Sequence, residues 1–266
     1  MNNPQPASGP LPIPITQIRR YLPAVPDALA RLLLLIVVAF FLKTFLLQPY
    51  LIPSESMEHT LLVGDFLLVN KQVYAPSGSI ARSFLPFREV ERGDIIIFHP
   101  PDSLSHLYVK RVIGIAGDRL RITGGRVTVN GVAVNEPFAV FESAVRNPYR
   151  DEFPATVYTD PNVEPAWWKR MQSLIHNGEL VVPQGEYFVL GDNRNYSKDS
   201  RYWGFVARQQ IIARPLVIYF SLTRPSTTDV QPTALQAAND KLGHGREFAV
   251  QLQSFARWNR IFHVVH

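Results

Sequence analysis

The chain of 266 residues contains no cysteine. This absence excludes disulfide bonds, zinc sites built from thiolates and a cysteine nucleophile. The sequence also lacks any run in which basic residues alternate with aromatic residues, and its net charge of +5 is small and dispersed. We therefore expect no nucleic-acid binding, and attraction to anionic lipid headgroups explains the charge more simply. With 46% hydrophobic and 18% charged residues, the chain is expected to fold around a sizeable core.

A metal site is not expected either. His99 and His106 are seven residues apart, but no cluster of further ligands accompanies them.

Long apolar runs are also rare, and the clearest one lies near the N-terminus. Residues 28–47 read ALARLLLLIVVAFFLKTFLL, and their uninterrupted apolar part, residues 32–42, is short for a membrane span of roughly 20 residues. Arg31 and Lys43 flank this part, and both side chains are long enough to reach the headgroups. The segment is therefore predicted to be a single transmembrane anchor.

A removable signal peptide is the alternative for this segment, because its apolar region has a similar length. The following residues 48–53 contain no small-x-small cleavage signal, and the preceding tail, residues 1–27, is rich in proline. We therefore favour an uncleaved anchor. Three arginines (Arg19, Arg20 and Arg31) precede the apolar core, while Lys43 and then Lys71 are the first basic residues after it. This bias predicts that the N-terminus lies in the cytoplasm and the rest of the chain outside.

The rest of the chain is predicted to be mainly β, with two lobes of antiparallel sheet. Short β-rich runs bounded by Gly, Pro or Asp occur at 66–69, 95–98, 108–115, 187–190 and 215–220. Two glycine-containing turns, at 124–125 and 130–131, predict a meander of three strands over 120–134. We assign the catalytic core to residues 48–73, 89–118 and 184–223, and a second β lobe to residues 74–88 and 119–183. Residues 224–266 form a C-terminal tail, in which 246–264 are predicted to form an amphipathic helix that packs on the core or lies at the membrane interface.

The most informative residue is Ser56, which closely follows the apolar segment. A serine hydroxyl becomes a good nucleophile only when a base removes its proton. His59 is close in sequence, but a side chain three residues away is seldom directed back at the nucleophile, and no Gly-x-Ser-x-Gly elbow is present. We therefore interpret His59 as a turn histidine.

Lys110 is the alternative base. A lysine is a base only when it is neutral, and burial among apolar groups lowers its pKa. In the strand expected around Lys110, alternation places Tyr108, Lys110 and Val112 on one face and Arg111 on the other. We expect Lys110 to point inward and Arg111 to point outward.

The chain resembles bacterial type I signal peptidases, the membrane-bound Ser/Lys enzymes that remove signal peptides from exported proteins. The resemblance rests on blocks in a fixed order, which cover roughly a third of the chain. After the anchor come residues 53–61 (PSESMEHTL), then 64–71 (GDFLLVNK), then 92–95 and 110–118, and finally 191–201 (GDNRNYSKDSR). Any single block would be weak evidence for this family, whereas all of the blocks in this order are specific for it.

The resemblance implies a role for each matching position. Ser56 matches the nucleophile and Lys110 the general base. Ser54 matches the hydroxyl that forms the oxyanion hole together with the backbone N–H of Ser56. Ser197 matches the residue that hydrogen-bonds and orients the base. Asp199 and Arg201 match an ion pair that supports the site.

The family cleaves after small residues spaced as Ala-x-Ala, which implies shallow apolar pockets. The matching positions are Tyr50, Ile52, Pro53, Met57, Leu61, Leu67, Ile97, Tyr108 and Val109. An extended substrate is expected to add a strand beside Tyr108 and Val109. Two positions depart from the family pattern: Glu55 stands where glycine is common, and His59 where proline is usual. Neither change removes a reacting group.

We therefore expect a single-pass enzyme of the bacterial cytoplasmic membrane, with its catalytic region on the outer side. Its partners would be signal peptides and the lipid bilayer, it would act as a monomer, and it would need no cofactor.

Two alternatives remain. A Ser/Lys autoprotease of the repressor type would carry a DNA-binding module where this chain has its anchor. A non-catalytic β-domain that binds exported proteins would be expected to lack Ser56 or Lys110.

Overall fold

The structure is a computed structural model that describes residues 27–41, 47–71, 88–101, 106–141, 146–223 and 256–265. The chain divides into two compact units, residues 1–43 and 44–266, and each is considered separately.

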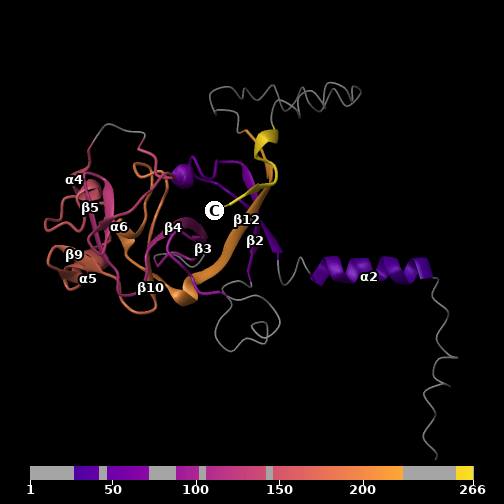
Figure 1. The fold of residues 1–266 in the computed structure, drawn as a ribbon, viewed down its shortest axis with the longest axis horizontal. Coiled ribbons are helices and arrows are strands. Elements are labelled where there is room, and N and C mark those ends of the chain that lie inside the picture. The colour runs from indigo at the N-terminus through magenta and orange to yellow at the C-terminus, as the bar shows by residue number, and fades with distance from the viewer. Residues whose placement is uncertain are drawn as a thin grey trace, which may run out of the picture. The chain divides into compact units, whose positions relative to one another are not determined.

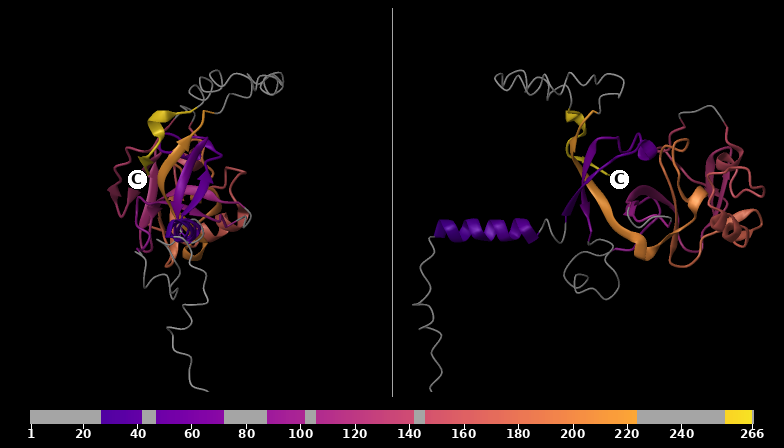
Figure 2. Two further views of the ribbon diagram at one scale, coloured as in Figure 1. Left: turned by 90° about the vertical axis from the view of Figure 1, so that its right-hand side faces the viewer. Right: turned by 180° about the vertical axis from the view of Figure 1, so that it is seen from behind.

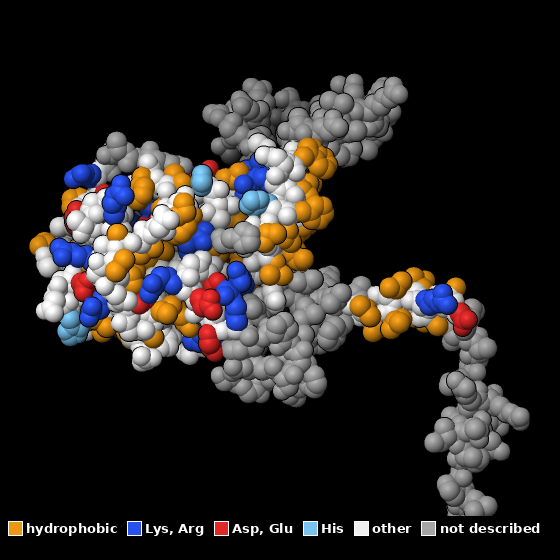
Figure 3. Space-filling view, in the orientation of Figure 1, with side chains coloured by type: hydrophobic (Ala, Val, Ile, Leu, Met, Phe, Trp, Pro, Cys, Tyr) orange, Lys and Arg blue, Asp and Glu red, His pale blue; other side chains and the backbone are white. Residues whose placement is uncertain are grey.

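The described part of the first unit is the helix α2, Asp27–Phe41, which has 15 residues. Hydrophobic side chains cover its surface, and the charged side chains gather at one end (Figure 3). Leu34, Leu35 and Phe40 are each about two-thirds exposed, at 64%, 66% and 66%. No helix of the described segments is both long and apolar enough to cross a membrane. Residues 42–46 of the predicted anchor lie outside the described residues, and Leu47 is the first residue of strand β1.

The second unit contains two antiparallel sheets, as the sequence predicts (Figure 1). The larger, eight-stranded sheet has the order β1-β2-β12-β3-β4-β10-β11, with β13 paired to β12. Its strands are β1 Leu47–Leu51, β2 Asp65–Asn70, β3 Ile95–Phe98, β4 Tyr108–Gly114, β10 Glu186–Leu190, β11 Val206–Ala207, β12 Ile211–Ser221 and β13 His263–Val264. These include every β-rich run predicted from the sequence outside the meander.

The smaller sheet has five strands in the order β7-β6-β5-β9-β8. They are β5 Arg119–Thr123, β6 Arg126–Val129, β7 Val132–Ala133, β8 Ile175–His176 and β9 Glu179–Val181. The strands β5, β6 and β7 form the predicted meander. Its second turn has a positive φ at both central residues, 55° at Asn130 and 79° at Gly131, which is the conformation that an Asn-Gly hairpin turn favours.

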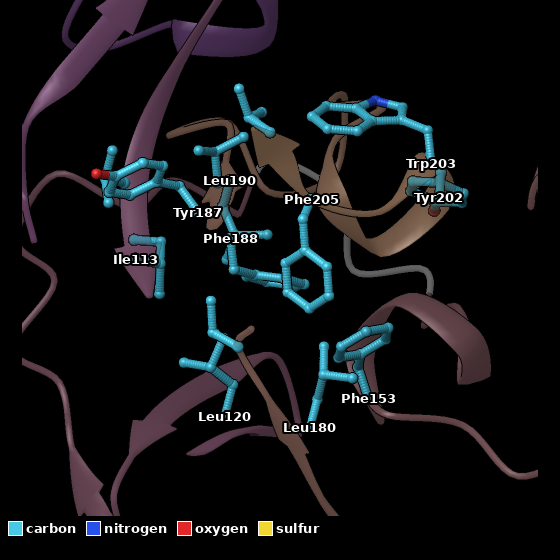
Figure 4. Close-up of a cluster of buried hydrophobic side chains, with 14 of the residues drawn as sticks. Ile113, Leu120, Phe153, Leu180, Tyr187, Phe188, Leu190, Tyr202, Trp203 and Phe205 are labelled. Atoms are coloured by element: carbon cyan, nitrogen blue, oxygen red, sulfur yellow. The ribbon is translucent and has the colours of Figure 1, made fainter. Parts of the chain in front are cut away.

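Short helices that the sequence analysis did not predict lie between the strands. They are η2 Glu55–Met57, α4 Pro148–Asp151, α5 Pro165–Gln172, α6 Ser200–Trp203, η3 Arg208–Gln210 and η4 Trp258–Arg260. One hydrophobic cluster joins the five-stranded sheet to α5, α6 and strand β10, and Figure 4 shows Leu120, Leu180, Phe153 and Phe188 facing one another in it. A second cluster, around Met57, Leu61 and Leu67, lies within the larger sheet.

The C-terminal prediction requires a correction. Residues 246–255 of the predicted amphipathic helix lie outside the described residues, but 256–264 do not continue an α-helix. They form the single turn η4 and the strand β13, which pairs with β12 through Val217–Val264 and Ile218–His263. Within these residues Phe262 is 77% exposed and Val265 is buried.

Candidate active site

Ser56 and Lys110 come together from distant parts of the sequence. Ser56 lies in the short helix η2, directly after β1, and Lys110 lies in β4. The Nζ of Lys110 donates a hydrogen bond to the Oγ of Ser56 at 2.6 Å. Both residues are buried, with exposed fractions of 9% for Ser56 and 4% for Lys110. Their proximity follows from the fold, because η2 packs against β4.

Burial lowers the pKa of Lys110 to about 8. The loss of water around an ammonium group disfavours the charged form and is the largest influence here. The negative charges of Asp199 and Asp192 oppose this effect, while the positive charge of Arg201 adds to it. The arrangement therefore gives a lysine that can be neutral in mildly alkaline solution while touching a serine hydroxyl.

Ser54 lies beside this pair. Its Oγ is 3.5 Å from the Oγ of Ser56, and its side chain is exposed. Ser54 is extended, with φ −135° and ψ 158°, immediately before η2. Both serines line the same cavity.

His59 lies apart from the Ser56–Lys110 contact. It is exposed and borders a different cavity, which Phe138 and His263 also line. Its φ of +80° is in the left-handed region, which proline cannot adopt because its ring fixes φ near −65°. Histidine in place of the proline that is usual at this position therefore goes with a backbone conformation that proline could not adopt.

The loop between β10 and α6 closes the back of the site. Asp199 is fully buried and receives hydrogen bonds from Arg201 Nε at 2.8 Å and Nη2 at 2.8 Å. Burial alone would raise the pKa of Asp199, but the Arg201 guanidinium holds it below its usual value. Asp199 also accepts the N–H of Gly191 at 3.1 Å. The predicted ion pair is present, and it fixes the loop from both ends.

Ser197 differs from its prediction. Its Oγ is buried and has no hydrogen-bond partner among the described residues, so the expected bond to Lys110 is absent. The ammonium of Lys110 is directed to Ser56 instead.

Arg111 also requires a correction. The alternation of β4 predicts that it points outward, yet only 4% of it is exposed. Its guanidinium binds both oxygens of the buried Asp192, at 2.9 Å and 2.8 Å, and lies over the ring of Phe138. The side opposite Lys110 is therefore covered by another part of the chain and does not face solvent.

Asp192 is a functional candidate that the sequence analysis did not single out. It is completely buried, and in addition to Arg111 it accepts the Thr60 hydroxyl at 2.6 Å. The next residue, Asn193, donates its backbone N–H to the carbonyl of Ser56 at 3.2 Å. A Cβ at Gly191 would overlap this carbonyl and the Ser197 side chain. The residues Gly191 to Asn193 therefore hold the nucleophile turn by close backbone approach.

A largely apolar cavity of about 330 Å³ opens beside Ser56 and Lys110. Several predicted substrate-binding residues line it: Tyr50, Ile52, Pro53, Met57, Tyr108 and Val109. Its wall also includes residues that were not predicted to bind substrate: Ser54, His106, Leu107, Tyr196 and Lys198. The other predicted substrate-binding residues, Leu61, Leu67 and Ile97, are at most 2% exposed and belong to the core cluster behind the cavity.

The two antiparallel sheets therefore bring a buried serine and a buried lysine into contact beside a largely apolar cavity. The family model described as "Signal peptidase, peptidase S26" matches residues 26–220. The chain belongs to this family and is a serine endopeptidase of the signal peptidase type.

The chain is similar in sequence to several proteins of known name. A protein named signal peptidase I from Aquifex aeolicus is 34% identical over 79% of this chain and 90% of its own length. Another signal peptidase I, from Leptolyngbya laminosa, is 35% identical over 71% of this chain and 76% of its own length. A crystal structure of a signal peptidase I from Enterococcus faecalis is 29% identical and covers 48% of this chain and 97% of its own, with a TM-score of 0.32.

Proposed function

We propose that this chain removes N-terminal signal peptides from exported preproteins, cleaving after an Ala-x-Ala-like site with Ser56 as nucleophile and Lys110 as general base. The observation that carries the proposal is the 2.6 Å contact between Lys110 Nζ and Ser56 Oγ, combined with a lysine pKa lowered to about 8. A hydroxyl held against a neutral amine is the arrangement that nucleophilic catalysis requires.

In the first half of the reaction, Ser56 Oγ attacks the carbonyl carbon of the scissile bond while Lys110 takes the hydroxyl proton. The Ser54 hydroxyl and the Ser56 N–H stabilise the oxyanion that develops. When the carbon–nitrogen bond breaks, Lys110 returns the proton to the leaving amine and an acyl-enzyme remains. In the second half, a water molecule gives a proton to Lys110 and attacks the ester carbonyl. When the bond to Ser56 Oγ breaks, Lys110 returns the proton to this oxygen, and the peptide leaves with a free carboxyl end. Loss of one oxyanion donor typically costs about 10²–10³ in rate.

The pairing of β4 supports an extended substrate. Residues Tyr108 to Lys110 pair with β3 on one side, whereas β10 joins the other side only from Arg111 onward. Among the described residues, the edge at Tyr108 and Val109 is therefore free for another strand, and it borders the cavity. A signal peptide that binds there would use backbone hydrogen bonds, and the cavity would select small side chains.

We further propose that residues 28–47 anchor the enzyme in the cytoplasmic membrane, with the N-terminus inside and the sheets outside. The apolar surface of α2 supports an apolar environment for this segment. All the proposed catalytic groups come from one chain, which is consistent with action as a monomer.

The decisive experiment compares cleavage of a preprotein bearing an Ala-x-Ala site by the full-length chain in detergent and by three variants. We expect Ser56→Ala and Lys110→Ala to be folded and inactive, and His59→Ala to be active. Activity that persists in Lys110→Ala, or disappears in His59→Ala, would contradict the proposed base. Binding without cleavage by the unmodified chain would favour a non-catalytic domain, and cleavage of the chain itself would favour an autoprotease.

A further inference from the structure

The last described segment of the chain folds back onto strand β12 of the larger sheet. We call residues 256–265 the C-terminal strap. The strap pairs with β12 through β13, and the N–H of Val265 donates to the carbonyl of Leu216 at 3.0 Å. Val265 is buried in the same hydrophobic cluster as Met57 and Leu61. Figure 2 shows the strap, in yellow, lying along the orange strand β12.

Arg260 of the strap binds the turn that follows Ser56. Its Nη2 donates to the carbonyl of Thr60 at 2.9 Å and to Asp65 Oδ2 at 2.6 Å, and its Nε donates to Asp65 Oδ1 at 3.1 Å. Asp65 is completely buried and also accepts the N–H of Leu62 at 2.8 Å. One guanidinium therefore fixes both ends of the segment from Thr60 to Asp65.

This segment connects to Ser56 through short steps. The N–H groups of Thr60 and Leu61 donate to the carbonyl of Met57, at 3.1 Å and 2.8 Å, so the turn begins at the residue after the nucleophile. The Thr60 hydroxyl binds Asp192 at 2.6 Å. The residue after Asp192 holds the carbonyl of Ser56. A shift of Thr60 would therefore move the nucleophile turn relative to the loop that supports it.

We propose that Arg260 is a positioning residue for the nucleophile and that the strap is part of the catalytic apparatus. The inference rests on the proposed function and adds a segment that lies beyond the family match, which ends at residue 220. Arginine suits this role because its planar fork presents several donors in a fixed geometry, and a lysine ammonium cannot reproduce that fork. Misplacement of reacting groups by about 1 Å can reduce the rate about 100-fold.

The test uses Arg260→Lys in the full-length chain. This variant keeps a positive charge for the buried Asp65, so it is expected to fold, but it loses the simultaneous hold on Thr60 and both carboxylate oxygens. Asn259→Ala is the matched control, because Asn259 is exposed in the same turn η4. We expect kcat to fall about 10- to 100-fold in Arg260→Lys with KM nearly unchanged, and no change in the control.

A second readout does not depend on activity. Hydrogen exchange should accelerate in Arg260→Lys at the amides of Thr60, Leu61 and Leu62, while the amides of the β5–β6 hairpin keep their protection. An exchange rate at these turn amides equal to that of the unmodified chain would overturn the proposal, and so would a kcat within about twofold of it. If the unmodified chain fails to cleave a preprotein, the proposed function is wrong, and the exchange data alone then decide whether Arg260 holds the turn.

Discussion

The strands β4 and β5 are consecutive in the chain but bury their side chains in different patterns. In β5 of the five-stranded sheet, Arg119 and Arg121 are exposed while Leu120 and Ile122 are buried. In β4 of the eight-stranded sheet, every residue from Val109 to Gly114 is buried, including two charged types. A sheet with one solvent-exposed face needs only alternating apolar and polar residues along each strand. In a sheet that is covered on both faces, each buried charge needs a hydrogen-bonding or ionic partner.

Two buried arginines at the site pair with carboxylates of the loop 191–199, and the buried Asp65 of β2 pairs with Arg260. Arg111 binds Asp192, and Arg201 binds Asp199 within the same stretch. Lys110 is the exception, because its hydrogen-bond partner is the neutral hydroxyl of Ser56. Lys110 therefore differs from these paired charges in contacting a hydroxyl, as the proposed role of general base requires.

The largest expected effect contrasts a buried ion pair with an exposed one. Replacing Arg201 by methionine leaves the carboxylate of Asp199 buried and uncompensated, and we expect the free energy of unfolding to fall by about 3–5 kcal/mol. The same change at Arg119, whose pair with Glu179 lies at the surface, should cost less than about 1 kcal/mol. Urea denaturation of both variants measures the two losses of unfolding free energy. Equal losses would contradict the distinction between the buried and the exposed ion pair.

The sequence alone predicted the three-stranded meander β5–β7 and the positions of the long strands, because turn residues and alternation are local signals. Through the resemblance of separate blocks it also singled out Ser56 and Lys110, which the fold brings into contact, and Asp199 and Arg201, which form an ion pair. It failed for Arg111 and for the C-terminal strap. Burial of Arg111 depends on Asp192, which is 81 positions away in the chain, and the strap is defined by its pairing with β12. A local sequence pattern predicts neither the contact of Arg111 with Asp192 nor the pairing of the strap with β12.

The second prediction concerns the pH dependence of activity. Because Lys110 must be neutral to act as the base, kcat/KM should rise with pH on the acid side, with an apparent pKa of about 8. Initial rates of peptide cleavage between pH 6 and pH 10, values chosen to bracket the ordinary histidine and lysine pKa values of about 6.5 and 10.4, would measure this limb. A midpoint near 6.5 that disappears in His59→Ala would assign the base to the histidine instead.

The same lysine should make stability depend on pH. Its pKa is about 8 in the folded chain and about 10.4 when unfolded, so between these values the unfolded chain holds the extra proton. Stability therefore rises with pH across this window, by about 1.4 kcal/mol per unit at most, and is independent of this group below it. Lys110→Met should be more stable than the unmodified chain at pH values below about 8 and should lack this rise. Parallel slopes for the two proteins would contradict the lowered pKa.

Two glycines provide a smaller contrast, between a turn of the five-stranded sheet and the loop that supports Ser56. Gly178, in the β8–β9 turn, has φ +75° and no neighbour where a Cβ would stand, so Gly178→Ala should cost about 1 kcal/mol through backbone strain alone and leave activity unchanged. Gly191 is crowded by the Ser56 carbonyl and the Ser197 side chain. We expect Gly191→Ala to lower kcat about 10- to 100-fold, because the nucleophile turn must move. Measuring both kcat and thermal stability separates the effects, and equal activities would show that the turn accommodates the methyl group.

The smallest expected effect tests whether an exposed charge matters next to the site. Glu55 precedes the nucleophile within η2, and its side chain is exposed. A carboxylate close to the oxyanion would oppose the charge that develops there, but water and salt weaken this repulsion over distances beyond about 8–10 Å. We expect Glu55→Gln to raise kcat by less than about twofold, with the gain larger at low ionic strength, as is usual for exposed charges. A tenfold gain in kcat that persists in high salt would show instead that the carboxylate points into the site. An exposed charge next to the nucleophile would then affect the reaction as strongly as a buried one.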